Sequence, residues 1–399
     1  MKRRLFFNFA VCCCILLQSS AYAAPAKDAA KKWNQQVGWL VLPIFFATDR
    51  QLDINSSDLN YKEEQMPEGL NYGVKNIVVP LEAHAAKQLS ALAPLGWYRL
   101  PGEGKAPPTL KNLGQEQLKT PTRTMKKDEF VGSVEKAIND SPRKEVLIYV
   151  HGCCADFKTS IERAARLAEW FKMPVVMDDW ASPVVRTWLP ELNEYRKNEV
   201  TYEQSQDRFN EFLDVLEEKF GAQRITVAAH SLGNRFLDAA MKRRYDRFAQ
   251  NPQHTKFNEV IYGCADVDAR AFANHSGKAA WNARINRIYA SENDSALATS
   301  KRIHGKQPRL GSPGPVLDAL SKTQKLDVVD VTDVGMNHEL PFWVMSNMHR
   351  YGRPGEKRDF DIIEKNPHYY VLRQKNAPAP TWWDLFRTSV AGKAVKPTR

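Results

Sequence analysis

The sequence predicts an α/β fold in which helices cover both faces of a mostly parallel β-sheet. From residue 146 onward, short apolar runs lie between amphipathic stretches. Within each run the apolar residues are consecutive and do not alternate with polar ones. Parallel strands are buried on both faces, so they have such continuous runs, and helical crossovers connect them. Of the 399 residues, 43% are hydrophobic and 26% are charged. This is the composition of a globular protein with a sizeable core.

The first 23 residues have the pattern of a cleaved signal peptide. The basic segment 1–4 precedes a short apolar stretch, residues 5–17, and Ala21-Tyr22-Ala23 places small residues at a cleavage site. The apolar stretch is shorter than the roughly 18 residues of a membrane span, and an uncleaved anchor is the alternative. We therefore expect an exported protein, either periplasmic or secreted.

After the signal peptide we expect one large domain with loose ends. Residues 24–38 are rich in alanine and lysine and are expected to form a flexible leader. Residues 39–376 are expected to form the α/β domain, which begins with an N-terminal strand extension. Residues 377–399 are expected to form a C-terminal tail.

Buried strands are expected wherever the apolar runs are short and rich in β-branched residues. The first, WLVLPIFFA, ends at Thr48-Asp49-Arg50, and the second follows the turn signal Asn71-Tyr72-Gly73. In chain order, the predicted strands are residues 39–47, 74–80, 146–150, 174–177, 225–229, 260–263, 285–290 and 327–331.

Amphipathic spacing predicts three helices between these strands. Residues 160–171 follow Thr159, which has capping-box spacing to Glu162. Residues 202–220 carry apolar side chains at three- and four-residue intervals. Residues 232–244 end in Lys242-Arg243-Arg244, a basic run that complements the helix dipole. We interpret this run as a solvent-exposed face and expect no nucleic-acid partner.

The sharpest signal for chemistry is Ala229-His230-Ser231-Leu232-Gly233, which lies between a predicted strand and a predicted helix. A nucleophilic serine on such a tight turn needs small residues on both sides, and Ala229 and Gly233 meet that need. The helix N-terminus below the serine also favours developing negative charge. Ser231 is therefore the predicted nucleophile, and a helix N-cap is the alternative interpretation.

A serine hydroxyl needs a base to accept its proton and an acid to orient that base. In this arrangement both follow the serine, each after a strand. Asp294 follows the strand at 285–290 and His338 follows the strand at 327–331, so we predict these two residues as acid and base. Other acids and histidines remain open as alternatives: Asp266, Asp268, Glu292, Asp333, His230, His349 and His368.

Two backbone N–H groups are candidates to stabilise an oxyanion. One belongs to Leu232 and the other to Cys153, in the loop His151-Gly152-Cys153-Cys154, where Gly152 permits close backbone approach. We expect no metal, because adjacent cysteines cannot both face one tetrahedral ion. No other cofactor is expected. A disulfide between Cys264 and this pair is left open, with free buried thiols as the alternative.

With these motifs the chain resembles a family of bacterial secreted α/β hydrolases of unknown function. The resemblance covers roughly residues 40–350 and includes Ala47-Thr48-Asp49-Arg50, Tyr149-Val150-His151-Gly152 and the segment 229–234. It implies an α/β-hydrolase fold with Ser231 as nucleophile, Asp294 as acid and His338 as base. Two departures are notable. Cys153-Cys154 replaces an aromatic residue and an asparagine, and Glu339-Leu340-Pro341-Phe342 replaces a Ser-Tyr-like continuation.

These residues predict a secreted serine hydrolase that cleaves carboxylic esters through an acyl-enzyme on Ser231. The expected substrate is a small-molecule or lipid-like acyl ester. A lipase or acyltransferase would use the same three residues. From a different class, a non-catalytic envelope-binding protein on a hydrolase scaffold is the rival. Contact with a membrane surface is left open, and the oligomeric state is not predicted.

Overall fold

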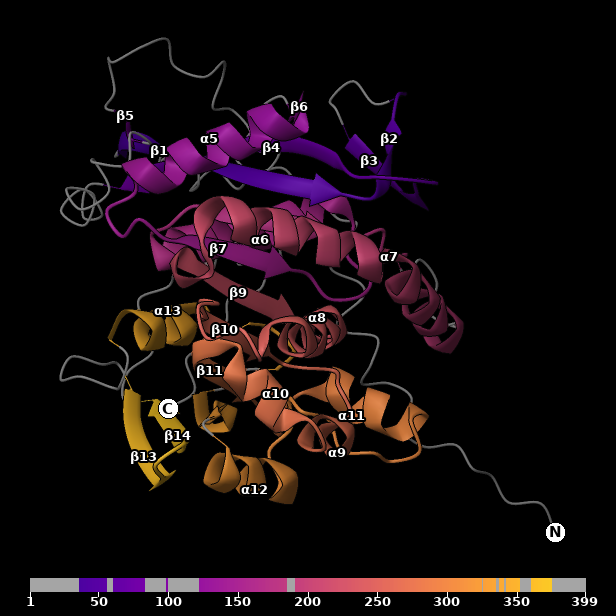
Figure 1. The fold of residues 1–399 in the computed structure, drawn as a ribbon, viewed down its shortest axis with the longest axis vertical. Helices are drawn as coiled ribbons and strands as arrows, with labels where there is room; N and C mark the ends of the chain where they lie inside the picture. Colours follow the sequence, from indigo (N-terminus) through magenta and orange to yellow (C-terminus); the bar gives the residue numbers. More distant parts are fainter. Residues whose placement is uncertain are drawn as a thin grey trace.

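The structure, a computed structural model, describes residues 36–55, 60–82, 98–99, 122–184, 191–324, 326–334, 337–340, 342–351 and 360–374. The predicted signal peptide, residues 24–35 of the predicted leader and the predicted tail lie outside these residues. Within them, a 12-stranded sheet forms the centre of the molecule. Its strands are stacked from β1 and β4 at the top of Figure 1 to β13 and β14 at the bottom.

The strand order across this sheet is β13-β14-β12-β11-β10-β9-β7-β8-β1-β4-β6, with β5 paired to β1. The strands are β1 (Gln36–Thr48), β4 (Asn71–Glu82), β5 (Tyr98–Arg99), β6 (Thr122–Met125), β7 (Val146–Val150), β8 (Val175–Asp179), β9 (Ile225–His230), β10 (Phe257–Gly263), β11 (Ala283–Ala290), β12 (Asp327–Asp330), β13 (Phe360–Asn366) and β14 (Tyr369–Gln374). A separate hairpin joins β2 (Arg50–Asp53) to β3 (Asn60–Gln65).

The middle of the sheet is parallel, as predicted. Every neighbouring pair from β1 through β8, β7, β9, β10, β11 and β12 to β14 runs in the same direction. The pairs β1–β4, β4–β6 and β13–β14 at the two ends are antiparallel. The strands predicted at 146–150 and 225–229 correspond to β7 and β9, which are buried at every position.

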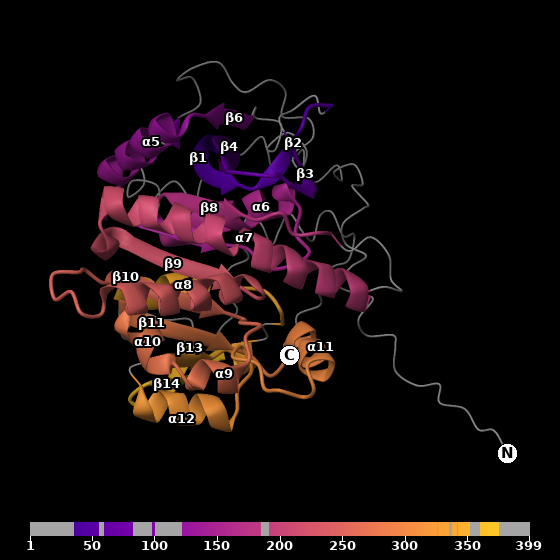
Figure 2. The same ribbon diagram turned by 45° about the vertical axis from the view of Figure 1, so that its right-hand side comes forward.

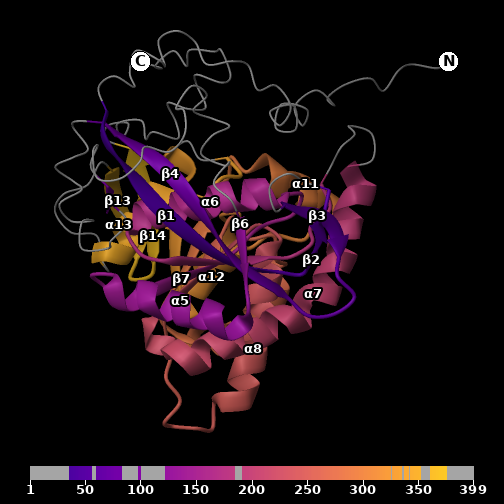
Figure 3. The ribbon, with the colours of Figure 1, turned by 90° about the horizontal axis from the view of Figure 1, so that it is seen from above.

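Helices cover both faces of the sheet and divide the core in two. The helices are α5 (Lys127–Asp140), α6 (Phe157–Phe171), α7 (Glu191–Phe220), α8 (Gly233–Phe248), α9 (Ala269–Ala273), α10 (Ser276–Trp281), α11 (Ser295–Ile303), α12 (Pro315–Thr323) and α13 (Phe342–Tyr351). Side chains of α5, α7, α8, α9, α10 and α12 contribute to one buried cluster. Those of α6 and α13 contribute to the other. Seen from above, α5 and α6 lie on either side of the β1–β4 pair (Figure 3).

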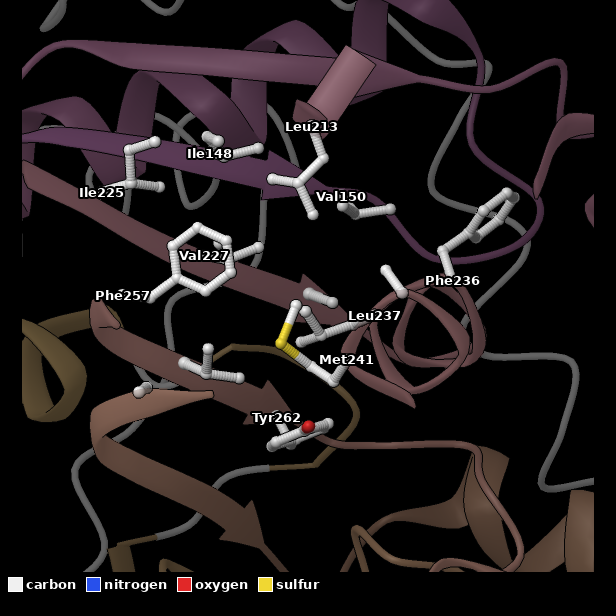
Figure 4. Close-up of a cluster of buried hydrophobic side chains, with 14 of the residues drawn as sticks. Ile148, Val150, Leu213, Ile225, Val227, Phe236, Leu237, Met241, Phe257 and Tyr262 are labelled. Atoms are coloured by element: carbon white, nitrogen blue, oxygen red, sulfur yellow. The ribbon is translucent and has the colours of Figure 1, made fainter. Parts of the chain in front are cut away.

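The cluster under α8 supports the part of the sheet that carries the candidate site. Figure 4 shows Leu237 and Met241 of α8 facing the strands, where Val150 of β7 and Val227 of β9 lie, while Phe236 of the same helix points to another side. All five side chains are fully buried. Burying each stabilises the fold by about 1.5–3 kcal/mol relative to leaving it exposed. The start of α8 is therefore fixed to the ends of β7 and β9.

Two local predictions were wrong. Helix α6 is capped by Asp156, whose carboxylate accepts a hydrogen bond from the Thr159 N–H at 2.7 Å. Asp156 has the extended backbone of an N-cap, so Thr159 falls inside the helix. Helix α7 begins at Glu191, eleven residues before the predicted start at 202. Figure 2 shows its first turns extending beyond the edge of the sheet, where apolar periodicity is not required.

Arg244 also differs from the prediction of an exposed basic run. Its side chain is only 3% exposed, and it forms an ion pair with Glu217 at 2.7 Å. Its guanidinium donates to Asn282 Oδ1 at 3.0 Å and lies over the Phe257 ring at 4.3 Å. A guanidinium can be buried in this way because its planar fork pairs and stacks at once.

No helix in the described part of the chain is long and apolar enough to cross a membrane.

Candidate active site

The predicted site residues lie at the carboxyl end of the parallel strands, where the chain changes direction across the sheet. From β7 the chain passes through α6 to β8 on one side, and after α7 it returns to β9 on the other side of β7. Loops leaving such a switch point diverge and open a crevice. The loop after β7 begins with His151, and the turn after β9 carries Ser231.

Ser231 occupies a strained turn between β9 and α8. Its φ of 52° lies in the left-handed region, which costs a non-glycine residue about 1–3 kcal/mol. The surrounding backbone holds this conformation. The Ser231 N–H donates to the Gly263 carbonyl at 3.0 Å, and the Ser231 carbonyl accepts the Asn234 and Asp266 N–H groups at 3.1 Å. Buried Ala229 completes the small-residue pattern of the turn.

The two predicted loop glycines are required by close packing. A Cβ added to Gly152 would lie 2.8 Å from the Ser231 Cβ, and one added to Gly233 would lie 2.3 Å from the His151 carbonyl oxygen. Both distances are below any normal Cβ contact. The loop after β7 therefore rests directly on the turn that carries Ser231.

The structure brings Ser231, His338 and Asp294 into one chain of contacts. The Ser231 hydroxyl lies 2.9 Å from His338 Nε2. On the other side of the ring, His338 Nδ1 is 2.8 Å and 2.9 Å from the two carboxylate oxygens of Asp294. Asp294 is also the N-cap of α11, where it accepts the Leu297 N–H at 2.9 Å. The helix start therefore fixes the carboxylate that orients His338.

Burial and charge act in opposite directions on His338. Burial disfavours its charged form, but the hydrogen bond and negative charge of Asp294 outweigh burial and raise the pKa of His338 above its usual value. His230 behaves differently. Burial and the neighbouring His338 hold the pKa of His230 well below its usual value. The neutral His230 ring donates from Nε2 to the His338 carbonyl at 3.1 Å, so it contacts the backbone of His338 rather than Ser231.

Buried polar contacts fix the loop after β7 from below. His151 Nε2 lies 3.2 Å from Asp179, and its ring stacks on Trp180 with centroids 5.3 Å apart. Arg50, fully buried, forms an ion pair with Asp179 at 2.9 Å and donates to the Ala155 carbonyl at 2.7 Å. Burial alone would raise the pKa of Asp179, but Arg50 and His151 lower it. The start of β2 and the end of β8 thus anchor both ends of the loop.

Both predicted oxyanion donors remain available. Within the described residues, neither the Leu232 N–H nor the Cys153 N–H donates a hydrogen bond to another protein group. By contrast, the Cys154 N–H donates to Ser182 Oγ at 2.6 Å, and Ser182 in turn donates to Asn198 at 2.6 Å. Cys154 is therefore held, while the N–H groups of Leu232 and Cys153 carry unused positive dipoles.

The cysteines are free thiols. Cys153 and Cys154 are partly buried and Cys264 is buried, and no disulfide joins these three described cysteines. Cys264 Sγ instead lies 3.5 Å from the Glu339 carbonyl. The disulfide left open from the sequence is therefore not formed in this structure.

The alternative acids take part in other contacts. Asp266 accepts a hydrogen bond from Ser300 Oγ at 2.6 Å. Asp268 is the N-cap of α9, and Glu292 and Asp333 are exposed. Of the acids considered, Asp294 is the one that contacts His338.

The alternative histidines lie elsewhere. His349 contacts Glu259, and His368 Nδ1 lies 2.8 Å from Asp327. Both carboxylates belong to the first half of their strands, at the opposite end of the sheet from Ser231.

Two supporting asparagines were not assigned a role from the sequence. The Asn234 side chain donates to the Ser231 carbonyl at 2.9 Å and to the Gly263 carbonyl at 3.1 Å. Asn337 accepts the Ser295 N–H at 3.0 Å, which ties the residue before His338 to the start of α11. Asn234 lies inside the resemblance motif at 229–234, so its position was a usable signal. Asn337 has no pattern that distinguishes it before folding.

The match to a protein-family model agrees with this architecture. A family model described as "Alpha/beta hydrolase of unknown function (DUF900)" matches residues 126–342, more than half of the chain. Curated proteins give no significant match. Among solved structures, an esterase of Pyrobaculum calidifontis is 13% identical, with 52% of this chain and 73% of that chain covered and a TM-score of 0.29. Carboxyl esterase 2 of Tuber melanosporum is also 13% identical, over 51% of this chain and 77% of that one, with a TM-score of 0.30.

Proposed function

Because the chain belongs to the family of α/β hydrolases of unknown function (DUF900), we propose that it is a serine hydrolase that cleaves carboxylic esters. The observation that carries the proposal is the continuous contact Ser231–His338–Asp294, with separations of 2.9 Å and 2.8 Å. Nucleophile, base and orienting acid have the geometry that acyl transfer needs. The substrate we propose is a small-molecule or lipid-like acyl ester.

The first half of the reaction forms an ester on Ser231. Its Oγ attacks the substrate carbonyl carbon while His338 Nε2 accepts the hydroxyl proton. Asp294 accepts the Nδ1–H and stabilises the imidazolium. The tetrahedral oxyanion is stabilised by the N–H groups of Leu232 and Cys153. The imidazolium then protonates the departing alcohol, and an acyl-enzyme remains.

The second half regenerates the serine. Water loses a proton to His338 Nε2 as its oxygen attacks the acyl carbon, and His338 then returns that proton to Ser231 Oγ. Removing one donor from an oxyanion hole costs about 10²–10³ in kcat. The packing of Gly152 on Ser231 supports this role for the neighbouring Cys153 N–H, since it brings the loop beside the nucleophile.

The test is labelling with a fluorophosphonate probe, which reacts with activated serines. We expect the wild-type protein to be labelled and Ser231→Ala to remain unlabelled. Ser321→Ala is the matched control, because Ser321 lies on α12 and its hydroxyl donates to the Asp318 carbonyl; it should label like the wild type. A folded wild-type protein that does not react would favour the non-catalytic envelope-binding rival.

An acyltransferase or lipase would use the same residues and differ in acceptor and substrate. Product analysis separates these functions. A nitrophenyl ester series of increasing acyl length, assayed with and without an added alcohol, should release free acid for a hydrolase. Dominant formation of the new ester would identify a transferase, and a rate that rises at substrate aggregation would identify a lipase.

We also propose that residues 1–23 direct export to the periplasm or beyond. The basic, apolar and small-residue segments described above support this proposal. Sequencing the N-terminus of the protein recovered outside the cytoplasm should give a chain that begins at Ala24. Recovery of full-length protein in the membrane fraction would favour the uncleaved anchor.

A further inference from the structure

The loop beside Ser231 contains two adjacent thiols that are close to bonding distance. Cys153 Sγ and Cys154 Sγ lie 2.8 Å apart, less than 1 Å more than the roughly 2.05 Å of a disulfide bond. Both residues are free and partly exposed. The pair therefore needs only a small movement to close and is within reach of a partner from solvent.

The backbone at the pair is held in an unusual conformation. Cys154 has a φ of 63°, in the left-handed region that non-glycine residues rarely adopt. The Ser182 hydroxyl accepts its N–H at 2.6 Å, and Arg50 donates to the carbonyl of the next residue, Ala155, at 2.7 Å. These contacts fix the Cys154 backbone in a conformation in which the two sulfurs lie 2.8 Å apart.

We propose that Cys153 and Cys154 form a reversible modification site, at which a disulfide-containing oxidant converts the two thiols to a vicinal disulfide and slows the hydrolase. The effect on activity rests on the proposed function, whereas the thiol chemistry does not. One thiolate attacks the oxidant RSSR and releases RS⁻, which leaves a mixed disulfide. The second thiolate then attacks the protein sulfur and releases another RS⁻. The two cysteine protons leave with the two RSH products, and RSSR is reduced.

Closure acts on the oxyanion-stabilising loop because the disulfide ring includes the Cys153–Cys154 peptide. Pulling the sulfurs together must turn this peptide and strain the Cys154 N–H bond to Ser182. It also shifts Cys153, whose own N–H is the proposed donor. An oxyanion donor works within about 2.7–3.1 Å of the oxygen, so a small shift weakens it. We expect the oxidised protein to hydrolyse esters at least about tenfold more slowly.

The surroundings of the two thiols also determine how fast they react with a disulfide. The hydrogen bond that the Cys153 thiol shares with Cys154, together with burial, raises the pKa of Cys153 well above its usual value. Since the thiolate is the attacking species, attack by Cys153 should be slow near neutral pH and accelerate as the pH rises.

Peptide mapping tests the site directly. The purified full chain is incubated with oxidised glutathione at mildly alkaline pH, alkylated and digested with trypsin. The peptide 145–158 (EVLIYVHGCCADFK) contains both thiols and no other cysteine, while 257–270 contains Cys264. We expect peptide 145–158 to lose two hydrogen atoms and escape alkylation, while Cys264 is alkylated. Ester hydrolysis, measured on the same sample, should fall and recover with dithiothreitol.

Two variants make the result decisive. Cys264→Ser keeps the pair and should retain the switch. Cys154→Ser should acquire one glutathione at Cys153 without closing a ring, which identifies the mixed disulfide. The proposal is overturned if peptide 145–158 keeps two alkylatable thiols, or if it is oxidised with no change in rate. A reduced protein that hydrolyses no ester contradicts the proposed function instead, and the peptide masses still decide the modification site.

Discussion

Two histidine–carboxylate pairs lie at opposite ends of the same sheet and have different surroundings. At the carboxyl end, His338 contacts Asp294 through Nδ1 and a neutral hydroxyl, Ser231, through Nε2. At the other end, His349 contacts Glu259 through Nδ1, and its Nε2 lies 3.3 Å from Glu145. The second ring therefore has a carboxylate on each nitrogen.

The other groups that contact each histidine–carboxylate pair decide what that pair can do. Glu259 is also paired with Arg287 on the neighbouring strand β11, and all three side chains are nearly inaccessible. Burial would raise the pKa of Glu259, but Arg287 and His349 lower it. This pair is a neutralised, fully paired cluster whose role is structural. His338 Nε2 faces the neutral Ser231 hydroxyl in place of a second carboxylate, and a ring nitrogen that can accept a hydroxyl proton is what a base requires. Mutations can therefore distinguish the roles of the two histidines.

The largest effect is expected from His338→Ala. Without a base, Ser231 loses its activation, and ester hydrolysis should fall on the order of 10⁵-fold. Steady-state assays, with circular dichroism to show retained fold, measure this loss. A residual rate within tenfold of the wild type would remove His338 from the mechanism.

Asp294→Asn should have the next largest effect. The amide no longer stabilises the imidazolium or selects the correct tautomer, so kcat should fall by about 10⁴-fold. The α11 cap is kept, because an asparagine also accepts the Leu297 N–H. Thermal unfolding should therefore change little. A large loss of stability with normal kcat would show that Asp294 serves only the helix.

His349→Ala is expected to affect stability and not catalysis. Removing one partner from a buried, charged cluster typically costs about 3 kcal/mol or more, and the cavity adds to this. The midpoint of urea unfolding should drop, while kcat/KM of the folded fraction stays at the wild-type value. A catalytic defect in the folded protein would show that the two ends of the sheet are coupled.

Activity and stability should depend on pH in opposite directions, because activity depends on His338 and stability depends on His349. His338 must be neutral to accept a proton, so kcat/KM should fall about tenfold per pH unit below its raised pKa. Its half-activity pH should lie above about 6.5, the ordinary histidine value, and shift lower in Asp294→Asn.

Stability should change in the opposite direction. Burial lowers the pKa of His349, but Glu145 and Glu259 outweigh burial and raise it. A raised histidine pKa contributes stability that is fully present below the unfolded value and is lost as pH rises through the folded value. Acid should thus preserve the His349 cluster while it inactivates the Ser231 site. Equal pH profiles of unfolding for the wild type and His349→Ala would contradict this assignment.

The same contrast explains how much the sequence could predict. Ser231, Asp294 and His338 each follow a buried strand, and parallel strands bring such positions to one edge, so their meeting followed from chain order. The Glu259–Arg287–His349 cluster has no comparable rule. A polar residue inside an apolar run indicates that a polar group is buried at a cost in free energy, but it does not identify the partner that offsets this cost. In addition, His349 lies on a helix that was not predicted.

Strand prediction failed for a related reason. The hairpin of β13 and β14 combines FDIIEKN with YYVLRQ, whose apolar stretches are short and flanked by charge. Such patterns suit the end of a sheet, where β13 is only partly buried, and they resemble loops. Fully buried β7 and β9 were predictable because burial on both faces leaves a continuous apolar run.

Arg50 connects the assembly of the site to the folding of the whole chain. Its bonds to Ala155 and Asp179 span 105 and 129 residues. Contacts between such distant segments form only after the intervening chain has been closed into a loop. Closing the loop costs conformational entropy, which is offset only when the contact has formed. The loop after β7 should thus acquire its shape once the N-terminal strand has docked. Activity would then return later in refolding than helical signal, and an early collapsed state would contain Ser231 without a completed oxyanion hole.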